Sequence, residues 1–157
     1  QTLVGVASGS IADGLISRGW RVVTVRKTLQ VLGSLLPAVF LLLATANPWA
    51  SSSSSLTSSF LYVTAGAAAS ALTLAAVSVN HLDVCPKNAG FTFAAGNTLA
   101  TIAGLISVPV SGLLLERTGS FTAVFACFAA HYVVGAALYA LLAGDQDVTA
   151  EMECDLD

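Results

Sequence analysis

Few side chains in this sequence could take part in chemistry, and most of them lie near the ends of apolar segments. Asp13 is close in sequence to Arg18 and Arg26, and Asp83 follows a later apolar stretch. A carboxylate such as Asp13 can pair with Arg26 or with the positive N-terminus of a neighbouring helix. Such contacts break and re-form when helices rock, so Asp13, Arg18, Arg26 and Asp83 are candidates for a conformational switch. The alternative is a solvated basic loop that only directs topology.

Two apolar segments each carry a stripe of small and polar residues. The members of each stripe are spaced by three or four residues, which places them on one face of a helix. Helix packing alone would explain both stripes, because small residues let helices approach closely in lipid. The other interpretation is a water-filled path between the two helices. Its candidate lining residues are Ser70, Thr73, Asn97, Thr101 and Ser111.

No set of residues has the spacing of an active centre. Cys85, Cys127 and Cys154 lie far apart without C-x-x-C spacing, which argues against a disulfide framework or a zinc site. No long apolar segment has a charge near its middle, where one would cost about 2.5–3.5 kcal/mol. We therefore expect free thiols, no enzymatic activity, no catalytic residue, no metal and no cofactor. The lone His131 is expected to be a packed residue.

The composition indicates a membrane protein. The chain is 55% hydrophobic and 10% charged, whereas about 25% of the residues of a soluble domain are charged. A surface in water needs those charges, and a surface in lipid does not. The acidic residues gather near the end of the chain and the basic residues near its start, so no basic face exists for nucleic acid.

Four segments have the length of a membrane span. A spanning helix needs about 20 apolar residues, and we expect transmembrane helices at 28–46, 60–79, 89–115 and 121–143. The apolar stretch at 1–16 is too short, and it is expected to be the end of a transmembrane helix whose beginning is missing. The expected structure is an all-α, polytopic membrane helix bundle.

The connections predict how the spans are oriented. Five of the six Lys and Arg residues lie in alternate loops, and such loops stay in the cytoplasm. We therefore expect cytoplasmic loops, or stromal ones in a plastid, at 17–27 and 80–88. The Ser-rich loop at 47–59 lies on the other side, 116–120 is a short turn, and 144–157 is an acidic, disordered tail.

Two motifs resemble a known family. The run A-D-G-L-I-S-R-G at 12–19, with V-R-K at 25–27, resembles the loop between helices eight and nine of the major facilitator superfamily. The run N-H-L-D-V-C-P-K-N-A-G at 80–90 resembles a segment of its anion:cation symporter branch. That branch holds sodium–phosphate cotransporters, vesicular glutamate transporters, sialin and plant plastid phosphate transporters. The match continues in order at Gly96-Asn97-Thr98, Ala103-Gly104, Gly112, His131-Tyr132 and Tyr139.

The resemblance implies a fold and a function. The chain would be a fragment that holds the end of helix eight and helices nine to twelve, with ten and eleven near the central cavity. It would belong to a secondary active transporter of inorganic phosphate or a small organic anion, a symporter coupled to Na⁺ or H⁺ that works by alternating access. The partners would be that anion, the lipid bilayer and the missing N-terminal half, which holds the substrate-binding arginines of the family.

A second hypothesis is a non-transporting four-helix membrane scaffold or assembly subunit. Either protein would be multi-pass, in the plasma membrane, a plastid or another endomembrane. The substrate, the coupling ion and the oligomeric state are not specified by these residues.

Overall fold

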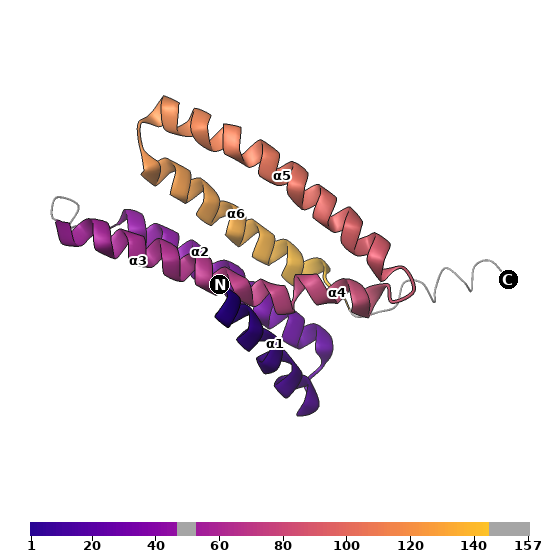
Figure 1. The fold of residues 1–157 in the computed structure, drawn as a ribbon. Helices are drawn as coiled ribbons and strands as arrows, with labels where there is room; N and C mark the ends of the chain where they lie inside the picture. Colours follow the sequence, from indigo (N-terminus) through magenta and orange to yellow (C-terminus); the bar gives the residue numbers. More distant parts are fainter. Residues whose placement is uncertain (47–52, 145–157) are drawn as a thin grey trace.

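The regular elements are all helical, as the sequence predicts. The structure, a computed structural model, describes residues 1–46 and 53–144 (Figure 1). In these two ranges the chain forms six α-helices and one 3₁₀ helix, and it has no strand. Their bounds are α1 Thr2–Ser17, α2 Val22–Thr45, α3 Ser53–Ala69, η1 Ser70–Ala75, α4 Val77–Val84, α5 Ala89–Thr118 and α6 Phe121–Leu142.

Four helical stretches are long and apolar enough to cross a membrane. They are α2, the continuous stretch Thr57–Val84 through α3, η1 and α4, then α5, and then α6. The mean hydropathy of their most apolar windows is 1.7 to 1.9. The shorter α1 is also apolar, and its place at the end of a longer span stays a prediction.

The helix ends differ from the sequence-based bounds. Helix α2 begins at Val22 instead of residue 28, because the apolar residues Val22, Val23 and Val25 continue its inner face toward the N-terminus. This start draws Arg26 into the first turns of the helix. Helix α5 continues to Thr118, where a C-cap glycine with φ +63° ends it.

Other expected bounds also shift, and some cannot be compared. Helix α4 continues to Val84, inside the connection expected at 80–88. The expected loop at 47–59 is helical from Ser53, while 47–52 and the acidic tail from 145 lie outside the described residues. The side of the membrane on which each loop lies stays a prediction.

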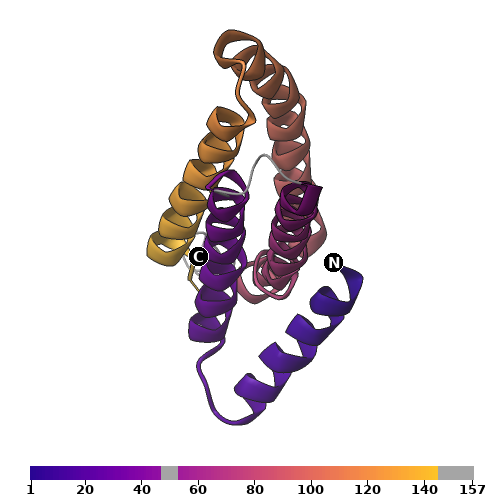
Figure 2. The same ribbon diagram turned by 90° about the vertical axis from the view of Figure 1, so that its left-hand side faces the viewer.

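Helix α2 lies between α6 and the α3–η1 stretch (Figure 2). The contact with η1 is close, because a Cβ added to Gly33 would lie 2.8 Å from Thr73 Cγ2 and 2.9 Å from the Thr73 backbone nitrogen. Similarly, a Cβ at Gly66 of α3 would lie 3.3 Å from Phe40 Cβ. Small residues therefore bring these helices together, as in other membrane bundles.

An apolar cluster lies where α1, α2 and η1 meet. Its buried members are Ala12 of α1, Val25 and Leu29 of α2, and Ala75 and Ala76 at the end of η1. Helix α5, in contrast, has no buried residue along its length, and it contacts α6 and α4 (Figure 1). The packed part of the structure is thus built around α2, and it includes the end of η1.

Candidate functional site

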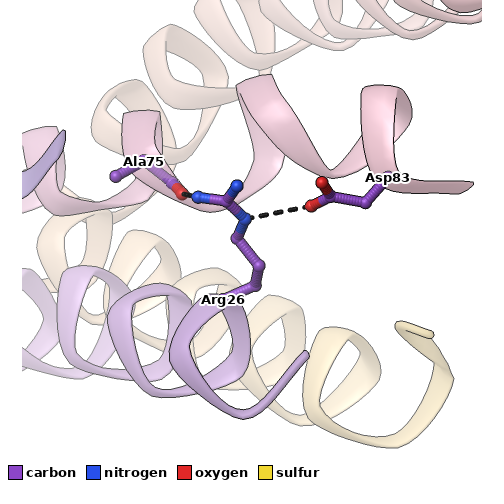
Figure 3. Close-up of polar contacts among 3 residues, drawn as sticks. All are labelled: Arg26, Ala75 and Asp83. Atoms are coloured by element: carbon purple, nitrogen blue, oxygen red, sulfur yellow. Dashed lines mark hydrogen bonds and ion pairs between the residues drawn. The ribbon is translucent and has the colours of Figure 1, made fainter. Parts of the chain in front are cut away.

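The candidate site is centred on Arg26, which links two membrane spans. Its Nε donates a hydrogen bond to Asp83 Oδ2 at 3.1 Å, and the two charges form an ion pair. Its Nη1 donates to the carbonyl oxygen of Ala75 at 2.6 Å (Figure 3). The residue is only 7% exposed. A buried guanidinium needs a counter-charge and hydrogen-bond acceptors, and these two partners supply both.

The carbonyl of Ala75 can accept this bond because the helix changes its pattern there. The N–H groups of Val79 and Asn80 both donate to the carbonyl of Ala76, at 3.3 and 3.0 Å. Ala76 itself has φ −105° and ψ −79°, away from regular helical values. The turn from η1 into α4 is therefore irregular, and the Arg26 side chain supplies a donor to the Ala75 carbonyl.

The four candidate switch residues do not form one cluster. The structure brings Arg26 and Asp83 together, while the side chains of Asp13 and Arg18 are exposed at the C-terminal end of α1. The structure does not show the pairing of Asp13 with Arg26 considered from the sequence, because Arg26 lies inside α2 and bonds the second span. The role of all four residues as a switch remains a prediction.

The candidate lining residues of the second span face a hollow that opens near α6. Ser70 and Thr73 line a hollow of about 580 Å³ together with Gln30, Ser34 and His131. The hydroxyl groups of Ser70 and Thr73 donate to backbone carbonyls of their own helix turn, at 2.8 Å each. Their hydrogen-bonding needs are thus met within the helix.

The candidate lining residues of α5 face elsewhere. Asn97 borders a hollow of about 430 Å³ that Asn80 and Tyr139 also line, and Ser111 borders one of about 470 Å³ between α5 and α6. Thr101 is exposed, and its hydroxyl donates to the Asn97 carbonyl at 2.9 Å. These candidate lining residues therefore border three hollows, and a single water-filled path stays a prediction.

Two polar groups near the Arg26–Asp83 pair were not identified as site residues. The hydroxyl of Tyr139 and the side-chain carbonyl of Asn80 are buried, and neither has a hydrogen-bond partner. Both residues line the same hollow. A sequence signal existed for Asn80, because it precedes Asp83 by one helical turn and so lies on the same face. Tyr139 was part of the family resemblance, but no spacing in the sequence places it beside Asn80.

The cysteines and other potential ligands do not form a metal centre in the described residues. No group of three or more His, Cys, Asp or Glu side chains lies there in a suitable arrangement. Cys85 and Cys127 are free thiols, as expected, and Cys154 lies outside the described residues.

No family model matches the chain. It is 39% identical over 118 residues to the voltage-gated purine nucleotide uniporter of Mus musculus, covering 75% of the chain and 25% of that protein. It is 31% identical over 144 residues to the chloroplastic sodium-dependent phosphate transport protein 1 of Arabidopsis thaliana, covering 90% and 26%.

A probable small intestine urate exporter of Homo sapiens is also similar, with 34% identity over 146 residues, covering 91% of the chain and 28% of that protein. The chain thus spans about a quarter of the length of the curated relatives it matches. Together with the four membrane-length helices, these matches make it part of an integral, multi-pass membrane protein.

Proposed function

Because the chain belongs to the anion:cation symporter branch of the major facilitator superfamily, we propose that it forms C-terminal helices of a small-anion transporter. The similarity over 75% to 91% of the chain carries this proposal. The names of these relatives specify a purine nucleotide, phosphate and urate, which are all anions at neutral pH. A membrane transporter of this kind needs no enzymatic step.

The proposed mechanism is secondary active transport by alternating access, in which two halves of the fold rock around a central site. The rest of the protein supplies the other half and the cationic residues that bind the anion. Na⁺ or H⁺ is the proposed coupling ion. The packing is compatible with this arrangement, because α2 and α6 lie together while α5 leaves its surface free.

The proposal is tested by uptake into liposomes. The protein is expressed from its complete gene, reconstituted, and supplied in turn with labelled phosphate, urate and ATP. Each anion is offered under an imposed Na⁺ gradient, a pH gradient and a membrane potential. We expect saturable uptake of at least one anion above the level of protein-free liposomes.

The matched control is residues 1–157 alone, reconstituted in the same way. We expect no uptake by this segment, because its described spans contain no cationic side chain near their middle. A folded, complete protein that moves none of the three anions under any gradient would contradict the proposal and favour the scaffold hypothesis. Saturable, ion-coupled uptake by the control segment would contradict the proposed division of roles.

A further inference from the structure

The second span has a joint, an interruption of its α-helix between α3 and α4. The joint lies close to the end of the span that the loop charges predict to be cytoplasmic. Between α3 and α4 the chain passes through the 3₁₀ helix η1, whose tighter winding often marks a hinge when it interrupts a helix. The irregular residue Ala76 follows η1 directly, and it is fully buried in the apolar cluster with Ala75. A buried point with irregular backbone can serve as a pivot for the segment beyond it.

The two sides of this joint are held very differently. Before it, η1 is in close contact with α2, where Gly33 leaves room for Thr73. Beyond it, α4 has no buried residue. Arg26 spans the joint, because it bonds the Ala75 carbonyl on one side and the Asp83 carboxylate on the other (Figure 3). The ion pair is therefore a major attachment of α4 to the packed part of the structure.

A second set of partners lies beside α4 and is not used. Tyr139 of α6 has a buried hydroxyl without a partner, and Asn80 of α4 has a buried carbonyl oxygen without one. The first is a donor and the second an acceptor, and both residues line one hollow. Leaving such groups unpaired in the interior is unfavourable, so a movement of α4 that joined them would recover a hydrogen bond.

We propose that α4 turns as a unit about Ala76 between two positions: one is locked by Arg26 on Asp83, and in the other Asn80 accepts a hydrogen bond from Tyr139. The movement would reach α5, because the His81 ring on α4 lies 5.1 Å from the Phe93 ring, centroid to centroid. The inference rests on the proposed transport function for its purpose, since a transporter must open and close its ends.

The experiment measures the position of α4 directly, without transport. Spin labels at Leu82 of α4 and Leu141 of α6, both exposed, report the distance between these helices by double electron–electron resonance in liposomes. A second pair at Leu61 of α3 and Leu141 reports whether the rest of the bundle moves. The complete protein is used with its native cysteines replaced, those of this chain by Cys85→Ala, Cys127→Ala and Cys154→Ala.

Two variants release the lock in different ways. Arg26→Gln removes both bonds across the joint, and Asp83→Asn keeps the bond to Ala75 while weakening the bond to α4. In each variant we expect the ratio of the population at the second Leu82–Leu141 distance to the population at the first to rise by about tenfold. This is the effect of losing one charge-assisted bond. Arg21→Gln, which removes an exposed positive charge at the residue before α2, should leave the ratio unchanged.

The second position is tested in the Asp83→Asn protein. There, Tyr139→Phe should return the ratio toward its original value, whereas the matched change Tyr132→Phe on the same helix should not. A single Leu82–Leu141 distance that is the same in every variant would overturn the hinge. A change in the Leu61–Leu141 distance equal to that in the Leu82–Leu141 distance would also overturn it. Equal effects of Tyr139→Phe and Tyr132→Phe would overturn the second position.

Uptake measured in parallel separates this inference from the proposed function. Normal anion uptake with a single α4 position refutes the hinge alone. The expected distance changes in a protein that takes up no anion refute the transport function and leave the movement of α4 established.

Discussion

Removing one partner of the Arg26–Asp83 pair should have unequal costs, depending on which partner is removed. The Arg26 side chain is 8% exposed and that of Asp83 is 24% exposed. In the Asp83→Leu protein, the Arg26 cation stays buried without a counter-charge, which typically costs about 3–5 kcal/mol. In the Arg26→Met protein, Asp83 can turn toward water, and the main loss is the donor to the Ala75 carbonyl, which costs about 1–3 kcal/mol.

The expected order is therefore a larger loss for Asp83→Leu than for Arg26→Met, with a difference of about 2 kcal/mol. The double variant should be more stable than the sum of the two single losses implies, because no unpaired charge remains. The assay is unfolding of the complete protein by sodium dodecyl sulfate in mixed micelles, followed by the far-ultraviolet circular dichroism of its helices.

Two results would refute this reasoning. If Arg26→Met costs more than Asp83→Leu, the buried cation does not dominate the balance. If the double variant loses the sum of the single losses, the two residues do not stabilise each other. Arg26→Lys provides a further comparison, because an ammonium group lacks the planar fork that reaches two acceptors at once, so it should rescue only part of the loss.

Three further predictions concern other parts of the chain. Gly33→Ala should destabilise the protein by about 1–3 kcal/mol through overpacking. Gly14→Ala should not, because no atom lies within 4 Å of the added Cβ, and unfolding in mixed micelles compares the two variants. Cysteines placed at Ser17 and Ser53 of the complete protein should react with impermeant reagents from opposite sides, and labelling from the same side would contradict the topology. Asp13→Asn should change the free energy of unfolding by less than about 0.5 kcal/mol, because the side chain is exposed, and it should lower anion uptake. Uptake at the wild-type level would leave the loop after α1 with only its role in topology.

The number and order of the spans follow from the sequence because each span is an uninterrupted apolar stretch of sufficient length. The start of α2 does not, because Arg26 and Lys27 have the charges expected of a loop. Only the distant acceptors of Arg26 explain why a charged residue lies inside the packed helix. The joint near Ala76 is also invisible in the sequence, since the run S-A-L-T-L-A-A at 70–76 contains neither glycine nor proline.

The sequence identified the residues of the site better than it identified the contacts between them. Arg26 and Asp83 were both identified as candidates, but they are 57 residues apart, and no local spacing could show that they pair. The stripe residues were identified from helical periodicity, which gives the face of a helix but not the neighbour that this face meets. Periodicity therefore could not show that Ser70 and Asn97 line different hollows.

The separation of Arg26 from its partner also bears on biogenesis. During synthesis α2 is made before the segment that carries Asp83, which follows Arg26 by 57 residues. Until it arrives, the Arg26 guanidinium must reach the lipid headgroups and water along its flexible stem. Its later bonds to Asp83 and the Ala75 carbonyl require the second span to lie at the matching depth. A misplaced span would leave the cation unpaired.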